Sequence, residues 1–360
     1  MIDGAARALA RAESARLMGL FAAAGAQPVE AAILQPAATL LDLYGEDIRA
    51  RAYVTADPLR GEMMLRPDFT VPVVQMHMDS GADPARYAYA GTVFRRQDSD
   101  LGRPHEFLQA GFEVFGGHGA PQADADVFAT LADALADLPL RAATGDIGLL
   151  SAAVRGLRTT EARKDALLRH LWRPRRFRAL LDRFGAPRPH AALALADAFA
   201  DAGPEIGLRT RAEVAQRLEA LRADAAAAPL AAEEIALIDR LLGLREDAPY
   251  ALAALRALAG DLGAIAPAVD AMAARLDALA ARGVAVETLA FEASFGRTSM
   301  EYYDGFVFGL YADGRPDLPA VASGGRYDAL TAVLGRGRVV PAVGGIIRPE
   351  LVVALRGGRA

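Results

Sequence analysis

Residues 87–117, YAYAGTVFRRQDSDLGRPHEFLQAGFEVFGG, predict two β-strands joined by a charged loop. The second strand has the period-two alternation of a pleated strand. One of its faces is apolar and is expected to pack in the core: Leu108, Ala110, Phe112 and Val114. The opposite face carries Gln109, Gly111 and Glu113. The first face is therefore expected to be structural, and the second face is available for another role.

The polar face of the hairpin has the chemistry of a ligand site. Gln109 and Glu113 flank Gly111, which is expected to leave space for a small ligand with an ammonium or imidazole group. On the first strand, Arg95 shares a face with Tyr89 and is expected to emerge near the loop, where it can meet an anion. The alternative is a hairpin with one core face and one solvated face, which is common in antiparallel sheets.

The composition excludes several classes of protein. With 360 residues, 53% hydrophobic and 24% charged, the chain is expected to be an ordinary soluble globular protein, long enough for two domains of roughly 150 residues. It has no cysteine, which excludes disulfides, thiolate nucleophiles and cysteine-ligated zinc. With five histidines and no H-E-x-x-H spacing, neither a metal site nor a cofactor is predicted.

The charge and the N-terminus indicate the compartment and the class of partner. The opening residues lack a charged leader and an apolar run, and no stretch approaches the ~20 apolar residues of a membrane span, so a cytoplasmic protein without membrane contact is expected. Lys164 is the only lysine, so arginine-rich stretches such as residues 173–178 are interpreted as compositional bias on a solvated helix face. The net charge of −5 also opposes binding to nucleic acid.

The order of predicted elements indicates an α+β fold. A helix is expected over residues 5–24, and helices rich in alanine, leucine and arginine are expected from 121 to 280. Strands are expected before and after this helical block, at residues 29–34, 52–55, 63–65, 87–96, 107–115, 288–293, 302–311, 320–323 and 342–347. The predicted organisation is a discontinuous core domain of residues 1–120 and 281–360 with an inserted helical region at 121–280. The composition of this region does not decide whether it docks a partner or only covers the sheet.

Five segments in this order resemble the catalytic core of histidyl-tRNA synthetases. They are LRPDFTVPV (65–73), YAGTVFRRQDSDLGRPHEFLQAGFEVFG (89–116), EYYDGFVF (301–308), SGGRYDAL (323–330) and VGGIIRPEL (343–351). The resemblance implies a class II aminoacyl-tRNA synthetase-like antiparallel sheet flanked by helices. Gln35-Pro36 stands where that family has its dimer-forming motif, which implies a homodimer.

The resemblance also implies a histidine pocket. In that family two acids and a carboxamide hold the substrate histidine. The acids correspond here to Asp68 and Glu113, and the carboxamide corresponds to Gln109. The implied histidine-binding set in full is Asp68, Thr70, Arg95, Gln109, Glu113, Tyr302 and Tyr303. Two carboxylates suit an α-ammonium and an imidazole, while tyrosines can wall the ring. Inward polar groups that only fix the sheet register are the alternative.

The residues of adenylate chemistry depart from the family pattern. Arg95 and Arg348 match its phosphate-binding arginines, but Gln97-Asp98 replaces a glutamate and an arginine, and Thr298 stands where an arginine is expected. Arg297 is one residue out of register, which on a strand or tight turn points a side chain elsewhere. The chain also ends about a dozen residues after Arg348, so the family's C-terminal anticodon-binding domain is expected to be absent.

This combination resembles the regulatory subunits of ATP phosphoribosyltransferase. The resemblance implies a subunit with no catalytic residues of its own. It would assemble with a short-form catalytic subunit that performs the first step of histidine biosynthesis, and histidine would be its effector. Such a function depends on the free energy that couples the histidine site to the active site of the partner. Two alternatives stay open: an ATP-dependent histidine-activating ligase or truncated synthetase, and a synthetase-like sensor that binds another partner.

Overall fold

The computed structural model describes residues 4–44, 48–97, 104–117, 119–186, 207–297 and 302–357. Within this part of the chain, nine strands form one mixed sheet in the order β1-β5-β6-β12-β11-β10-β7-β9-β8, and three form a small sheet in the order β2-β4-β3. The main-sheet strands are β1 (Gln27–Pro28), β5 (Ala85–Phe94), β6 (Glu106–Phe115), β7 (Leu140–Asp146), β8 (Arg245–Asp247), β9 (Ala290–Glu292), β10 (Phe306–Ala312), β11 (Ala322–Arg326) and β12 (Ala342–Ile347). The small sheet has β2 (Leu34–Pro36), β3 (Val54–Asp57) and β4 (Gly61–Leu65). The expected α+β class is confirmed.

The hairpin of β5 and β6 forms as the alternation predicts. Its antiparallel register places Gly91 opposite Gln109 and Tyr89 opposite Gly111. Residues 108–115 of β6 are all buried, so the alternative with one solvated face is wrong. The apolar face packs under α1 (Gly4–Ala23), where the Phe21 and Phe112 rings stack at 5.5 Å. The polar face is covered as well, which requires its polar groups to find partners inside the protein.

Two glycines make room for side chains of the polar face. A Cβ on Gly111 would lie 2.2 Å from Cζ of Tyr89, and a Cβ on Gly344 would lie 1.4 Å from Oε2 of Glu113. The space at Gly111 is thus filled by the Tyr89 ring, and the expectation that this glycine leaves room for a ligand is wrong. Both glycines are needed because no larger residue fits beside these neighbours.

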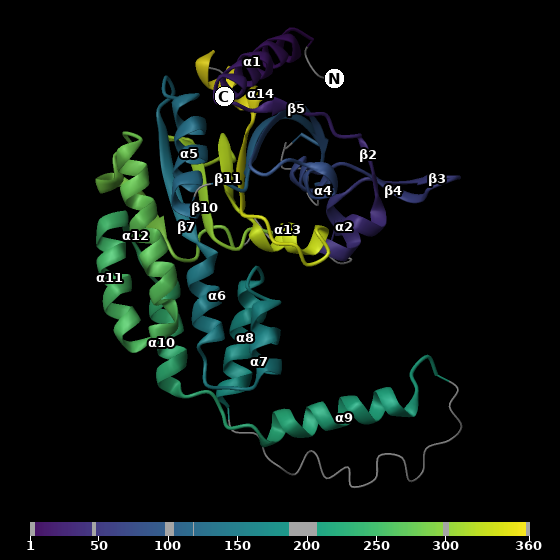
Figure 1. The fold of residues 1–360 in the computed structure, drawn as a ribbon, viewed down its shortest axis with the longest axis vertical. Coiled ribbons are helices and arrows are strands. Elements are labelled where there is room, and N and C mark those ends of the chain that lie inside the picture. Colours follow the sequence, from purple (N-terminus) through teal and green to yellow (C-terminus); the bar gives the residue numbers. More distant parts are fainter. Residues whose placement is uncertain are drawn as a thin grey trace.

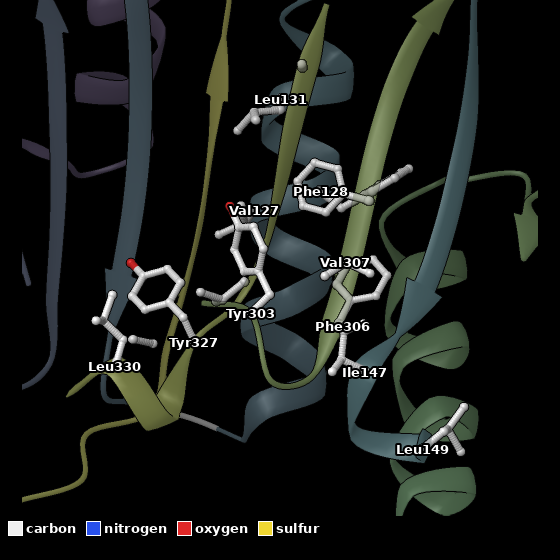
Figure 2. Packing of buried hydrophobic residues seen from close by; sticks show 14 of the residues in the cluster. Val127, Phe128, Leu131, Ile147, Leu149, Tyr303, Phe306, Val307, Tyr327 and Leu330 are labelled. Carbon is white, nitrogen blue, oxygen red and sulfur yellow. The ribbon is translucent and has the colours of Figure 1, made fainter. Parts of the chain in front are cut away.

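Helices cover the sheet and continue away from it (Figure 1). α5 (Ala120–Asp133) and α12 (Ala266–Ala281) run side by side along the main sheet, and Figure 2 shows Phe128 of α5 near Phe306 and Val307 of β10. The Phe128 ring lies 5.2 Å from that of Phe308. The remaining helices are α2 (Ala37–Tyr44), α3 (Ile48–Arg51), α4 (Thr70–Ser80), α6 (Ile147–Arg155), α7 (Glu161–Leu168), α8 (Pro174–Gly185), α9 (Arg211–Ala226), α10 (Ala232–Leu242), α11 (Ala248–Asp261), α13 (Asp328–Leu334) and α14 (Pro349–Arg356), with short 3₁₀ turns at Gly263–Ile265 and Val286–Thr288. No described helix is both long and apolar enough to cross a membrane.

The expectation that residues 121–280 are helical throughout is wrong at two strands. β7 pairs antiparallel with β10 and parallel with β9, and β8 closes the edge of the main sheet beside β9. β7 reads LRAATGD, in which alanines hide the alternation, and its pairing partners come more than a hundred residues later. The division of the chain into a core domain and an inserted region stays a prediction, with these two strands as structural members of the main sheet.

The predicted strand at 29–34 is also wrong. The chain pairs with β5 at β1, Val29 N–H donates to Ala88 O at 2.8 Å, and pairing resumes only at β2, in the small sheet. Residues 29–33 therefore carry the chain from one sheet to the other. Other strand ends shift by a few residues, as is usual for boundaries; the strand expected at 302–311 begins at Phe306.

A buried network of charges ties α12 to the sheet. Arg275 of α12 contacts Asp124 of α5 at 3.1 Å and Asp146 at the end of β7 at 2.5 Å. Arg326 of β11 reaches the same Asp124 at 2.7 Å. All four side chains are at least nine-tenths buried, so each charge depends on its partners for solvation.

Candidate functional site

One cavity of about 360 Å³ gathers most of the residues that the sequence assigns to a histidine pocket. We call it the site cavity. Six of the seven assigned residues line it: Asp68, Thr70, Arg95, Gln109, Tyr302 and Tyr303. Arg348, which matches a phosphate-binding arginine of the synthetase family, lines it as well. So do three residues to which the sequence gave no role: Arg51, Tyr311 and Ser323. The cavity therefore has donors, acceptors and both signs of charge within one small volume.

Short segments at the ends of strands position these side chains. Asp68 lies in the turn from β4 into α4, where its Oδ1 accepts from Val71 N at 3.4 Å, and Thr70 is the first residue of α4. Gln109 is on β6, and Arg95 directly follows β5, the antiparallel neighbour. Tyr302 and Tyr303 precede β10. The pairing of β5 with β6 holds the backbone of Gln109, and the other side chains reach the same cavity from segments that adjoin strands.

Glu113 is the assigned residue that the structure places behind the cavity wall instead of in it. Its Oε1 accepts hydrogen bonds from Tyr89 at 2.8 Å and from Thr70 at 3.2 Å, and its Oε2 accepts from Tyr327 at 2.6 Å. Burial raises the pKa of Glu113 to about 7 against the opposing effect of these hydroxyl donors, and the charge of nearby Asp68 adds to the rise. Glu113 therefore acts on the cavity indirectly, through its hydrogen bond from Thr70, which lines the cavity.

Gln109 has a buried acceptor whose partner is missing from the described residues. The side chain is 1% exposed, and its Oε1 accepts no hydrogen bond from them. An unsatisfied buried acceptor costs on the order of 1–3 kcal/mol. A ligand in the site cavity that offers an N–H group would remove this cost.

Two arginines form a cationic wall of the cavity. The guanidinium carbons of Arg95 and Arg348 lie 5.6 and 6.0 Å from the ring centroid of Phe107, and Arg95 Nε donates to Pro67 O at 2.9 Å. Burial, and to a lesser extent the charge of Arg95, lowers the pKa of Arg348 to about 10. Within the described residues, neither guanidinium forms an ion pair. The wall is thus suited to a carboxylate or phosphate.

Aromatic rings close the remaining side. The Tyr302 and Tyr303 rings lie 4.6 Å apart between centroids. The Tyr303 and Tyr327 rings, both labelled in Figure 2, lie 6.2 Å apart. Burial raises the pKa of Tyr302 above its usual range, helped by the charge of Asp68. The sequence reasoning gave Tyr327 no role, although it lies inside one of the matching segments; its contact with Glu113 spans 214 residues, and no local pattern signals it.

Two residues at which the chain departs from the synthetase pattern, Arg297 and Gln97, lie among the described residues. Arg297 Nε donates to Leu171 O at 2.8 Å, and its guanidinium lies 4.9 Å from the centroid of the Phe177 ring. It is buried against the inserted helices and does not line the site cavity, as its shifted position predicts. Gln97 Nε2 donates to Pro104 O at 3.5 Å. Asp98 and residues 298–301 lie outside the described residues.

Comparisons with known proteins identify the family of the chain. The family model described as histidyl-tRNA synthetase matches residues 4–224 and 194–352. The chain is 34% identical to a protein of Mesorhizobium japonicum named ATP phosphoribosyltransferase regulatory subunit, over 95% of this chain and 97% of the relative. The chain belongs to the histidyl-tRNA synthetase-like family of ATP phosphoribosyltransferase regulatory subunits. A Brucella ovis relative of the same name is 33% identical over 92% of this chain and 94% of its own.

Solved structures show the fold of this family. A Bacillus halodurans protein described as an ATP phosphoribosyltransferase regulatory subunit/histidyl-tRNA synthetase superposes with a TM-score of 0.70 at 23% identity, over 97% of this chain and 79% of its own. The histidyl-tRNA synthetase of a Nostoc species gives a TM-score of 0.63 at 17% identity, over 98% of this chain and 72% of its own. The class II synthetase-like fold expected from the sequence is therefore confirmed.

Proposed function

We propose that this chain is the regulatory subunit of an ATP phosphoribosyltransferase and that it binds histidine in the site cavity. Its partner would be a short-form catalytic subunit that performs the first step of histidine biosynthesis, with this chain required for activity and for inhibition by histidine. The names of full-length relatives at 33–34% identity support the regulatory role. The subunit would be cytoplasmic and dimeric, with no chemistry and no nucleic acid binding of its own.

The observation that carries the proposal is the combination of groups in the site cavity: two arginines, a carboxylate, and the buried Gln109 Oε1 that accepts no hydrogen bond from the described residues. Histidine bears a carboxylate, an ammonium and an imidazole N–H. The cationic wall of Arg95 and Arg348 suits the carboxylate, and the Asp68 carboxylate suits the ammonium. The Gln109 Oε1 acceptor suits an imidazole N–H. Each feature of the ligand has one counterpart in the wall.

Glu113 contributes to this pocket from behind. It accepts from Thr70, which lines the cavity, and from Tyr89 and Tyr327, which do not. A residue that holds the wall in place is a positioning residue, so removal of its charge is expected to change histidine binding without removing a direct contact. This is a different role from the direct contact that the resemblance implied.

The proposal is tested in two steps with the full-length chain. Isothermal titration calorimetry should show histidine binding to the purified chain, and Asp68→Asn should weaken it. Mixing the chain with a short-form catalytic subunit should produce phosphoribosyltransferase activity that histidine inhibits, and this inhibition should weaken in Asp68→Asn. Absence of any gain in activity would overturn the regulatory assignment, and inhibition unaffected by the substitution would remove the site cavity from the mechanism.

A histidine-activating enzyme is the second candidate, because Arg95 and Arg348 both line the cavity in a position suited to phosphate. Histidine-dependent exchange of labelled pyrophosphate into ATP by the isolated chain would support it. No exchange, together with activation of the catalytic subunit, would support the regulatory role.

A further inference from the structure

A second cavity of about 490 Å³ lies between α13 and the segment that joins α7 to α8. Figure 1 shows α7 and α8 across from α13, on the side where the inserted helices face the core. Its walls include Arg169, His170, Trp172 and Arg173 from the joining segment and Leu330 and Val333 from α13. We call it the second cavity. The function proposed above uses none of these six residues.

Two polar atoms in this wall are buried without a partner. Nε1 of Trp172 and Nδ1 of His170 are hidden from solvent, and neither forms a hydrogen bond within the described residues. The indole N–H can only donate, and a histidine ring nitrogen can donate in the appropriate tautomer. Both atoms are therefore suited to an occupant that offers acceptor oxygens.

The surface around the second cavity is strongly basic. Residues 169–178 contain five arginines and no acid, in a chain whose net charge is −5, and one of the five, Arg178, pairs with Asp182 and Asp239. Arg175 and Arg176 are exposed on the first turn of α8 and form no ion pair within the described residues. Asp304 is the acidic residue in the wall, and its carboxylate accepts backbone N–H groups from Asp328 at 3.1 Å and from Ala329 at 2.5 Å. These bonds turn its carboxylate toward the first turn of α13, and Arg169 and Arg173 outnumber it in the wall, so the net charge of the wall is positive.

The α13 side of the second cavity is apolar. Leu330 is buried, with 4% of its surface exposed, and Val333 is 60% exposed at the rim of the cavity. A nucleic acid offers few apolar groups that could pack against this wall. A peptide with an apolar side chain between carboxylates would match both the apolar α13 side and the basic side of the cavity. The local composition thus favours a protein segment over a polynucleotide.

We propose that the second cavity and Arg175 and Arg176 form the docking site for an acidic segment of the catalytic subunit, with one apolar side chain placed against Trp172 and Val333. This rests on the proposed function and adds the surface and the chemistry of the partner. Tyr302 lines both the second cavity and the site cavity. A segment docked in the second cavity can therefore reach a residue that histidine would also contact, which provides a direct route for coupling between partner and effector.

The chain itself supplies the probe for this proposal. Trp172 is its single tryptophan, so 5-fluorotryptophan labelling of the full-length chain gives one ¹⁹F NMR resonance, located in the second cavity. Unlabelled short-form catalytic subunit is titrated in. We expect the resonance to shift on complex formation, and we expect the double variant Arg175→Glu/Arg176→Glu to raise the Kd at least about tenfold. The matched control is Arg217→Glu/Arg256→Glu, two exposed arginines on α9 and α11, which should change the Kd by less than about twofold.

The outcomes separate this proposal from the function on which it rests. A complex that forms with an unmoved resonance, or with the same Kd in both double variants, overturns the docking site and leaves the regulatory function in place. If the unsubstituted chain forms no complex and gives no activity, the proposed function fails and the docking site with it. If transfer RNA moves the resonance at the same salt concentration and with comparable affinity, the surface is a nucleic acid site and the proposal is wrong.

Discussion

Tyr327 donates a 2.6 Å hydrogen bond to Glu113, a carboxyl group that is 1% exposed and 214 residues away along the chain. The bond joins β6 to the segment between β11 and α13, and the same carboxyl accepts from Tyr89 and Thr70. One buried acid therefore organises the back of the site cavity, and its protonation state is expected to matter for the stability of the fold.

Replacing this acid with its amide should remove a pH dependence of stability. Burial raises the pKa of Glu113 from its usual 4.5 to about 7 in the folded state. Between these values the native protein holds a proton that the unfolded chain has lost, so the free energy of unfolding falls as pH rises through this window. From pH 5 to pH 8, urea denaturation should show the unsubstituted chain losing about 2–3 kcal/mol more than Glu113→Gln. Parallel pH profiles for the two proteins would contradict the assignment of this proton to Glu113.

Gln109→Met should separate binding from stability. The Gln109 Oε1 acceptor is buried and without a donor in the described residues, so its loss costs the empty protein nothing and can stabilise it. Histidine, in contrast, should bind at least about fivefold more weakly, since one good hydrogen bond is worth roughly 1 kcal/mol or more. Calorimetric titration gives the affinity, and thermal unfolding gives the stability. As a control, Gln97→Met changes a glutamine that does not line the site cavity, and its histidine affinity should not change.

Arg95→Met should discriminate between ligands with and without a carboxylate. If this guanidinium meets the carboxylate of histidine, the variant should lose at least about tenfold in affinity for histidine, because charge-assisted hydrogen bonds contribute about 1.5–3 kcal/mol. Histamine lacks the carboxylate, so its affinity should hardly change. Arg96→Met is the matched control, since Arg96 is exposed and outside the cavity wall. An equal loss for both ligands would show that Arg95 acts through packing on Phe107 instead.

The hairpin and most of the site cavity could be predicted from the sequence because their signals are local. Period-two alternation fixed which side chains of β6 share a face, and the matching segments named the residues that line the cavity. The position of Glu113 behind the wall could not be predicted, because Tyr89 fills the space over Gly111 and Tyr327 arrives from a distant strand end. Contacts of this kind depend on the packed tertiary structure, and a local sequence pattern carries no information about them.

The strand β7 was missed for a related reason. Its sequence, Leu140–Asp146, has no clear alternation, and its neighbours are β10 and the parallel strand β9. Parallel pairs require long connections, so nothing nearby in the chain marks the partner. The same distance hides the ion network at the end of β7, where Asp146 meets Arg275.

Arg275→Met is expected to destabilise the protein strongly, by about 3–5 kcal/mol, because it leaves the buried carboxylates of Asp124 and Asp146 without this partner. The control is Arg282→Met at the end of the same helix, whose partner Asp126 is 30% exposed; an exposed pair contributes less than about 1 kcal/mol. Urea denaturation at neutral pH measures both. Adding Asp146→Asn to Arg275→Met should restore part of the loss, because the amide carries no charge to solvate. Equal effects of the two arginine substitutions would show that α12 is held to the sheet by apolar packing and that the buried charges contribute little.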